Sequence, residues 1–263
     1  AQIPALQRLD ESTRREIVRD LEDRLKRPLA NITEDSMAGE LANCISGRVA
    51  GAFDLQGPSY AADAACAGSL AALYNAVLGL RQGHFDTAVV GGVDSNMGPE
   101  SYVKFCKIGA LSPDGSRPFD AGANGFVMGE GAAVFILKRL EDARRDNDKV
   151  SAIIKGIGAA SDGKGKGITA PNPRGQRAAL DAAYRDSGLR PSDMSYVECH
   201  GTSTAVGDAV EGRVLAEFFQ ADGAAVGSIP IGSVKSQVGH LKGGAGAAAM
   251  LKVVLGLEHE TRF

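Results

Sequence analysis

The sequence lacks three features that would each have placed it in a common functional class. Its 29 lysine and arginine residues are outnumbered by 32 aspartate and glutamate residues, so it lacks the basic excess of a nucleic-acid-binding domain. It has no run of about 18 apolar residues that could span a membrane, and its amino end is charged where a signal peptide would be apolar. We therefore expect a cytoplasmic protein that binds neither nucleic acid nor membranes.

Cysteine is scarce, and its spacing argues against two further kinds of site. The four cysteines are Cys44, Cys66, Cys106 and Cys199, and they form neither a CxxC pair nor the paired pattern of a disulfide framework. Zinc sites and disulfides are therefore not expected, and the thiols should be reduced. Each cysteine is then either a small core residue or a reactive thiol.

Alternating strands and helices predict an α/β protein. Hydrophobic residues make up 44% of the chain, enough for the core of one large domain or two. The expected strands span residues 60–64, 86–92, 126–138, 150–159, 194–199 and 230–235, and the expected helices span residues 11–26, 66–81, 101–107, 174–187, 207–220 and 243–258. This order indicates mixed, mostly parallel sheets with helices packed between and around them. A charged turn at residues 146–148 divides the chain into two expected halves, 1–148 and 149–263.

Cys66 lies where a short apolar run meets a helix of small residues. The spacing of Leu70, Leu73 and Val77 places one apolar face on that helix. A thiol at a helix N-terminus faces unpaired N–H groups and the positive end of the helix dipole, which favour the thiolate. Cys66 is therefore a candidate nucleophile, and the alternative is that it is a small buried core residue.

Two histidines and a lysine follow the ends of two later expected strands. His200 ends the first of these strands, and Lys235 and His240 lie on the loop that leaves the second. Since ligands collect at the carboxyl ends of parallel strands, we expect these side chains and Cys66 to converge on one site. Taken alone, each histidine would more often be a structural residue with satisfied hydrogen bonds, and it is the joint pattern that indicates a site.

An ordered set of motifs accompanies these residues along nearly the whole chain. The motifs are Gly47-Arg48-Val49-Ala50, Phe53-Asp54-Leu55-Gln56-Gly57-Pro58, Asp63-Ala64-Ala65-Cys66-Ala67-Gly68-Ser69-Leu70, Gly91-Gly92-Val93-Asp94, Arg117-Pro118-Phe119-Asp120, Gly125-Phe126-Val127-Met128-Gly129-Glu130-Gly131, His200-Gly201-Thr202-Ser203-Thr204 and Lys235-Ser236-Gln237-Val238-Gly239-His240. Together they resemble the β-ketoacyl synthases, the condensing enzymes of fatty acid and polyketide synthesis, which have the thiolase-like fold. In detail they are most similar to the ketosynthase domains of large iterative polyketide and polyunsaturated fatty acid synthases.

The resemblance implies a role for each candidate residue. Cys66 matches the cysteine that carries the acyl chain, and His200 and His240 match the two active-site histidines that stabilise an enolate. Lys235 matches the lysine beside them, and Glu211 matches a glutamate expected to pair with that lysine. The Lys235–Glu211 pair is equally open to a purely structural interpretation.

The resemblance also implies the substrates and partners. No cofactor is expected, because the acyl and malonyl thioesters arrive on the phosphopantetheine arm of an acyl carrier protein. Thr202 and Thr204 could bind that arm, although turn formation is the commoner role for threonine. Lys164 and Lys166 are either solvated or meet the acidic carrier protein. We also expect a homodimer, formed through the apolar run 88–92, and neighbouring acyltransferase and carrier domains.

Two further expectations concern the extent of the chain and its alternatives. A ketosynthase begins upstream of Ala1 and continues beyond Phe263, so the chain resembles one that is truncated at both ends and has an incomplete fold. A non-condensing ketosynthase-like partner or acyl-binding domain is the alternative function, although such proteins lose the nucleophile that Cys66 supplies here. A thiolase is a third option, but no second cysteine lies in the matching context near the C-terminus.

Overall fold

The computed structural model describes residues 8–26, 31–165, 167 and 170–261. Lys166 therefore lies outside the described residues. Contacts between Cα atoms divide the chain into two compact units, Ala1–Ala61 and Ala62–Phe263, which are described separately. Within the described ranges, no helix combines the length and the apolar character needed to cross a membrane.

The smaller unit contains three helices among its described residues, α1 (Glu11–Lys26), α2 (Ser36–Glu40) and α3 (Asn43–Ala52). Asp10 caps α1, since its carboxylate accepts hydrogen bonds from the backbone N–H and the hydroxyl of Thr13 at 2.9 and 2.7 Å. Arg24 and Asp20 form an ion pair one helical turn apart at 2.9 Å. The helix expected at 11–26 is thus confirmed with the same bounds.

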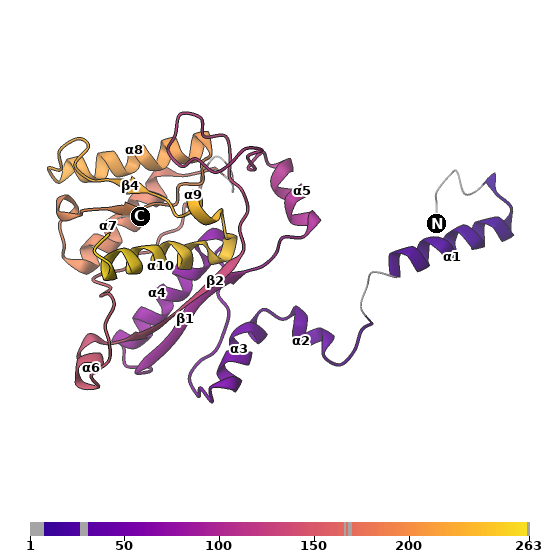
Figure 1. Ribbon diagram of the computed structural model, residues 1–263, viewed down its shortest axis with the longest axis horizontal. Helices are drawn as coiled ribbons and strands as arrows, with labels where there is room; N and C mark the ends of the chain where they lie inside the picture. The colour runs from indigo at the N-terminus through magenta and orange to yellow at the C-terminus, as the bar shows by residue number, and fades with distance from the viewer. Residues whose placement is uncertain (1–7, 27–30, 166, 168–169, 262–263) are drawn as a thin grey trace. The chain divides into compact units, whose positions relative to one another are not determined.

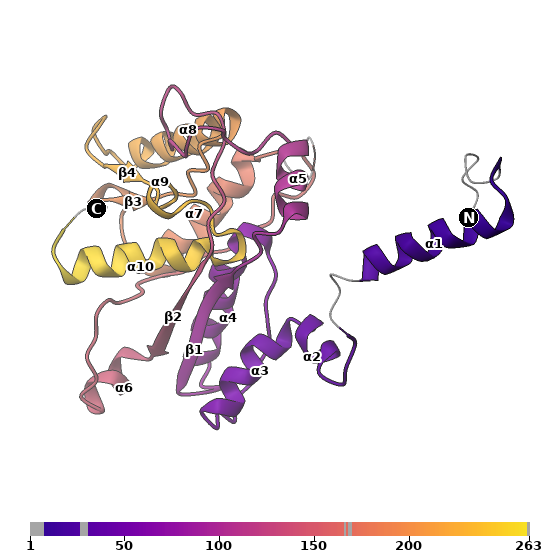
Figure 2. The ribbon, with the colours of Figure 1, turned by 45° about the vertical axis from the view of Figure 1, so that its right-hand side comes forward.

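The larger unit is built on an antiparallel pair of long strands and a helical layer. Strand β1 (Thr87–Asp94) pairs with β2 (Gly131–Lys138) in the register Thr87↔Lys138 to Asp94↔Gly131. Helices α4 (Gly68–Arg81) and α10 (Ala245–Glu258) pack on one face of this pair, as Figures 1 and 2 show. Val134 and Ile136 of β2 point away from those helices and are 63% and 66% exposed.

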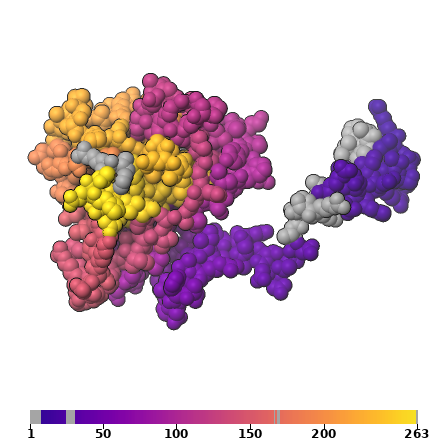
Figure 3. Space-filling view, in the orientation of Figure 1, coloured from indigo at the N-terminus to yellow at the C-terminus, as the bar shows by residue number. Residues whose placement is uncertain are grey.

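A second part of this unit carries the histidines. The short strands β3 (Val197–Glu198) and β4 (Ile231–Gly232) pair in parallel, with Val197 opposite Ile231. Helices α7 (Pro173–Ser187) and α8 (Ala205–Ala221) pack together beside them over the buried side chains of Cys199, Leu215, Phe218 and Phe219. The orange α8 and yellow α10 both lie on the face seen in Figure 3.

Shorter elements complete the described chain. They are α5 (Pro99–Lys107), α6 (Leu140–Arg145), α9 (Lys235–Val238) and the 3₁₀ turns η2 (Ala65–Ala67), η3 (Pro191–Asp193) and η4 (Lys242–Gly244). Turns η2 and η4 are in contact, which brings the start of α4 against the start of α10.

Every expected helix is confirmed to within two residues at each end, but two expected strands are wrong. Residues 60–64 and 150–159 pair with no strand in the part of the chain that the structure describes. Residues 156–158 instead lie directly on α7, where a Cβ on Gly158 would come within 2.3 Å of the Ala183 nitrogen. The Ile157 N–H donates to the Asp186 carboxylate at 2.8 Å. A side chain thus accepts the hydrogen bond that a neighbouring strand would have accepted.

The sheets are mixed, as expected, but the longer pairing is the antiparallel one. The expected strand 126–138 begins only at Gly131, whose φ of +155° interrupts the strand conformation. Phe126 and Met128 instead make isolated bridges to Leu111 and His240. Residues 126–129 therefore lie outside the sheet, and residues 127–129 contact the backbone of His240.

Candidate active site

Cys66 lies in η2, immediately before α4, on a sharply turned backbone. Ala65 has a φ of +49°, which costs a non-glycine residue of the order of 1 kcal/mol. The turn is held because the Ala65 N–H donates to Asp63 at 2.8 Å and the Ala67 N–H donates to the carbonyl oxygen of Ala64 at 3.0 Å. The half-buried thiol is therefore placed by a strained turn at the start of the α4 helical segment.

The charge state of Cys66 differs from the one that its position at a helix start predicts. Burial raises the pKa of the Cys66 thiol, and this outweighs the cations of Lys235 and Lys242, which lower it. The carboxylate of Asp94 adds to the rise. Near neutral pH the resting side chain is thus mainly the thiol, and the expected thiolate is not favoured before substrate binds.

The peptide of His200 is held from both sides. Its N–H and that of Gly201 donate to the two carboxylate oxygens of Glu211 at 2.7 and 2.8 Å. Its carbonyl oxygen accepts from the ammonium group of Lys235 at 2.6 Å. Lys235 and Glu211 act on each other electrostatically, since each shifts the pKa of the other, but neither a hydrogen bond nor an ion pair joins these two described side chains directly. Each instead anchors the backbone of the residue that carries the imidazole.

His240 is only 1% exposed and is hydrogen-bonded on three sides. Its N–H donates to the carbonyl oxygen of Val127 at 2.8 Å, and its carbonyl oxygen accepts from the N–H of Gly129 at 3.0 Å. Its ring Nδ1 accepts from the backbone N–H of Lys242 at 2.9 Å. Since a backbone N–H can only donate, Nδ1 carries no proton and the proton of the neutral ring lies on Nε2.

The two imidazoles face each other at the site. Their ring centroids are 5.7 Å apart with an interplanar angle of 87°, and Phe126 packs on His240 at 4.8 Å. Burial lowers the pKa of His200 to about 4 and that of His240 to about 3, and the nearby charge of Lys235 adds to both shifts. By accessible surface His200 is exposed, whereas His240 is buried. Both rings are therefore neutral near pH 7, and each has one N–H to donate.

Lys235 connects the thiol to the histidines. Its side chain starts in α9 and is 3% exposed, and its charge acts on Cys66, His200 and His240. Burial lowers the pKa of Lys235, whereas Glu211 and Cys66 raise it. One buried cation thus lies within electrostatic range of all three candidate catalytic groups.

The threonines lie beside this constellation. The hydroxyl groups of Thr202 and Thr204 are 3.0 Å apart and bond to each other, and Thr204 immediately precedes α8. Ser203 between them is fully buried with a φ of +61°. Its hydroxyl accepts from the N–H of Arg117 at 2.8 Å, and its carbonyl oxygen accepts from the N–H of Gly125 at 2.7 Å.

Sequence reasoning missed two residues that the structure places at the site, Ser203 and Lys242. Ser203 joins residues 117–126 to the loop that follows His200 through two hydrogen bonds. Its position between the two threonines was the available sequence signal. Lys242 contacts His240, and a lysine in a run of glycines was the available signal.

Cys199 belongs to the core, although it is the neighbour of His200. Its side chain is buried in the α8 cluster, and its Sγ donates to the carbonyl oxygen of Val197 at 3.6 Å. Burial and the carboxylates of Glu211 and Glu198 raise the pKa of Cys199 to about 12. Of the two alternatives that the sequence leaves open for each cysteine, this burial fits a small core residue.

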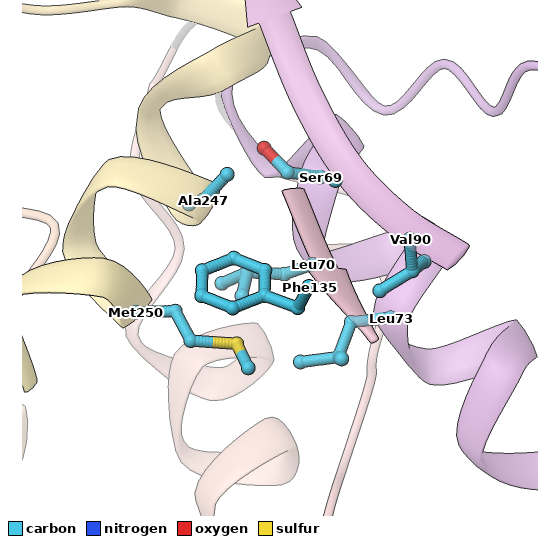
Figure 4. Close-up of a pocket in the computed structure, with 9 residues that line it drawn as sticks. Ser69, Leu70, Leu73, Val90, Phe135, Ala247 and Met250 are labelled. Atoms are coloured by element: carbon cyan, nitrogen blue, oxygen red, sulfur yellow. The ribbon is translucent and has the colours of Figure 1, made fainter. Parts of the chain in front are cut away.

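Among the described residues, a metal site and the cavity beneath α4 are the two other kinds of functional site to compare with this one. Over the described ranges, no three histidine, cysteine or acidic residues are placed to hold a metal ion. A small apolar cavity lies between α4, β1, β2 and α10, where Leu73, Val90, Phe135 and Met250 surround it (Figure 4). Ser69, whose hydroxyl donates to the Gly243 carbonyl oxygen at 2.5 Å, closes one side. The residues that line this cavity include none of the candidate catalytic groups.

Comparison with known proteins places these residues in a family. Residues 18–143 match the β-ketoacyl synthase N-terminal domain and residues 151–262 match the C-terminal domain. The PKS-NRPS hybrid synthetase ATPKS of Aspergillus niger is 46% identical over 217 residues, which cover 82% of this chain and 12% of that protein. The 6-methylsalicylic acid synthase of the same organism is 44% identical over 218 residues, which again cover 82% of this chain and 12% of that protein.

Solved structures show the same relationship. The ketosynthase from module 6 of the bacillaene synthase of Bacillus subtilis superposes with a TM-score of 0.82 at 40% identity, covering 87% of this chain and 42% of that one. The oxazolomycin ketosynthase domain OzmH KS7 of Streptomyces albus gives a TM-score of 0.78 at 41% identity, covering 83% and 39%. The chain therefore spans less than half of the ketosynthases that it matches, and it has their thiolase-like α/β fold. Its motifs, its fold and its matches to both family domains show that the chain belongs to the β-ketoacyl synthase family.

Proposed function

We propose that this chain supplies the catalytic groups of a β-ketoacyl synthase. The enzyme transfers an acyl chain to Cys66 and joins it to a malonyl unit by decarboxylative Claisen condensation, giving a β-ketoacyl thioester. The observation that carries this proposal is that one buried lysine acts on three groups, the two neighbouring neutral imidazoles and the thiol at a helix start.

The first step is acyl transfer to Cys66. The Cys66 sulfur attacks the carbonyl carbon of an acyl thioester, a new S–C bond forms, and the carrier thiol leaves with the proton. Because the resting thiol is protonated, substrate binding must shift it toward the thiolate. The ammonium group of Lys235 supplies the nearby positive charge that favours this shift.

The second step forms the carbon–carbon bond. The malonyl carboxylate leaves as carbon dioxide, and its electrons form an enolate whose oxygen accepts hydrogen bonds from His200 and from Nε2–H of His240. The enolate carbon then attacks the Cys66 thioester, which releases the Cys66 sulfur and the β-ketoacyl product. Neutral imidazoles suit this role, since a fixed N–H donor aimed at a developing negative charge accelerates such reactions by about 10²–10³-fold.

The substrates and partners follow from the same proposal. Acyl and malonyl groups would arrive on the phosphopantetheine arm of an acyl carrier protein, past the hydroxyls of Thr202 and Thr204, with no cofactor of the enzyme's own. The proposal also includes a homodimer, neighbouring acyltransferase and carrier domains, a division of the chain at residues 148 and 149 and a cytoplasmic location. The unpaired edge of β1 supports the dimer, because it pairs with no other strand among the described residues than β2. Sedimentation showing only monomer at micromolar concentration would contradict it.

Separating acylation from condensation tests the proposal. In the whole polypeptide that contains these residues, we expect His200→Ala and His240→Ala to leave acylation of Cys66 partly intact while reducing condensation about 10²-fold or more. His84→Ala, which changes an exposed histidine remote from the site, is the matched control. Wild-type condensation in both variants would contradict the role of the imidazoles. Acylation without condensation in the wild type would favour the acyl-binding alternative.

A further inference from the structure

Lys242 has a buried side chain that the proposed reaction does not use. It lies two residues after His240 at the start of η4, and its side chain is 12% exposed. Its backbone φ is +49°, a conformation that glycine adopts freely and that is strained for a lysine. The side-chain contacts and the hydrogen bond of its backbone N–H accompany this strained conformation.

Lys242 closes a ring of hydrogen bonds around His240. The His240 carbonyl oxygen accepts from the Gly129 N–H at 3.0 Å, and the Gly129 carbonyl oxygen accepts from the Lys242 ammonium group at 3.0 Å. The backbone N–H of Lys242 then donates to Nδ1 of the His240 ring at 2.9 Å. This cycle of hydrogen bonds runs from the backbone of His240 through Gly129 and Lys242 to the imidazole of His240.

Asp94 holds the charged end of this ring. Its carboxylate lies 3.1 Å from the Lys242 ammonium group, and the sulfur of Met97 lies 3.9 Å from the same nitrogen. Asp94 is the last residue of β1 and stands opposite Gly131, so the ion pair ties η4 to the end of the two long strands. The contact with Gly129 is equally constrained, because a Cβ on Gly129 would come within 2.2 Å of the Val238 carbonyl oxygen.

We propose that Lys242, anchored by Asp94, is a positioning residue that fixes the orientation and the Nε2–H tautomer of His240. The proposal deepens the proposed function and rests on it for its kinetic part. The lysine side chain acts through Gly129 and through the strained backbone of its own residue. It does not need to touch substrate.

Two readouts test the role of Lys242. We expect Lys242→Met to reduce kcat for decarboxylative condensation by about 10–100-fold, with KM changed less than about threefold, because a misplaced donor costs rate more than binding. Acylation of Cys66 should fall less than condensation does. Asp94→Asn should show the same pattern with a smaller loss, and Lys242→Arg should restore part of the rate.

The second readout is independent of turnover. The sequence has four histidines, so nitrogen NMR of the protein labelled with ¹⁵N-histidine resolves their ring tautomers. In the wild type, His240 should show an unprotonated Nδ1 and a protonated Nε2, and Lys242→Met should shift these signals. If the wild type shows the tautomer but does not condense, the proposed function fails and this inference stands.

Two further variants distinguish a specific effect of Lys242 from a general effect of removing a lysine or of backbone strain. Lys138→Met removes another partly buried lysine, which pairs with Asp146 and Asp148 at 2.5 and 2.6 Å, and it should leave the His240 signals and the kcat unchanged. Lys242→Gly relieves the strained φ and keeps the backbone N–H, so it should fold at least as well as Lys242→Met, but it removes the contacts of the ammonium group with Gly129 and Asp94 and should still shift the His240 signals. Unchanged His240 signals and unchanged kcat in both Lys242 variants would overturn the proposal, as would an equal effect of Lys138→Met.

Discussion

Cys66 is half-buried and Cys199 is buried, and their surroundings also differ in charge and backbone. Cys66 lies on a strained turn before α4, near the cations of Lys235 and Lys242. Cys199 lies in the core beside α8, and burial, with a smaller contribution from the carboxylates of Glu211 and Glu198, raises its pKa to about 12. Burial raises the pKa of both thiols, so the two sites differ in the sign of the neighbouring charges and in the greater solvent access of Cys66.

Removing each thiol should separate the two regions most clearly. We expect Cys66→Ala to reduce acyl transfer at least about 10³-fold, because the acceptor of the acyl group is lost. Cys199→Ala should change turnover less than about threefold and lower the free energy of unfolding by about 1 kcal/mol through the small cavity that it leaves. Acyl-transfer assays and thermal unfolding of both variants measure this contrast. Equal loss of turnover in the two variants would contradict it.

Neutralising the shared cation should give the next largest effect. We expect Lys235→Met to reduce condensation by about 10²-fold, since it removes the charge near Cys66 and the donor that anchors His200. The pKa of both His200 and His240 should rise, because the repulsion from Lys235 is lost. Titration of the histidine ring signals by NMR, with Lys138→Met as control, checks this. Unchanged pKa values in Lys235→Met would contradict the electrostatic role.

The reactivity of the two thiols should differ in its dependence on pH. Burial raises the pKa of Cys66 above the usual value of 9.0, so its alkylation by iodoacetamide should still be rising above pH 9. Cys199 should react at least about tenfold more slowly throughout, because a buried thiol reacts only when the core opens. Peptide mapping after brief alkylation measures both rates. The comparison would be wrong if Cys199 were labelled as fast as Cys66 in the folded protein.

The last expected effect is on stability in acid. His240 has a pKa of about 3 when folded and 6.5 when exposed, so the unfolded chain binds more protons between these values. The contribution of His240 to stability is therefore complete above pH 6.5 and is lost as the pH falls, by about 2–3 kcal/mol at pH 4.5. Denaturant unfolding of the wild type and of His240→Gln at several pH values isolates this contribution. Parallel pH profiles of the two proteins would contradict it.

The helices and the candidate site were largely predictable from the sequence, whereas the strand pairing was not. Apolar periodicity places the helix from Gly68 to Arg81, and the expected helix at 66–81 differs by only two residues. Periodicity cannot show what a strand pairs with, so residues 150–159 have a strand-like pattern and yet pack on α7. The expected strand 60–64 likewise has no strand partner among the described residues.

Residue types identified the groups at the site better than they identified their contacts. Cys66, His200, His240 and Lys235 could be named because each lies at an expected strand exit or helix start. The bonds of Lys235 and Glu211 to the His200 backbone depend on distances of a few ångströms that no sequence spacing specifies. The sequence position of Cys66 predicts a thiolate, whereas burial in the folded chain raises the pKa of the thiol.

The most direct test of the catalytic role of Cys66 is to locate the acyl group after one turnover. The whole polypeptide that contains these residues is incubated with an acyl thioester, digested and mapped by mass spectrometry. We expect one acyl group per chain, on the peptide that contains Cys66, and its loss when a malonyl thioester is added. An acyl group on Cys199 or Cys106, or none on Cys66 in the folded protein, would contradict the assignment of the nucleophile.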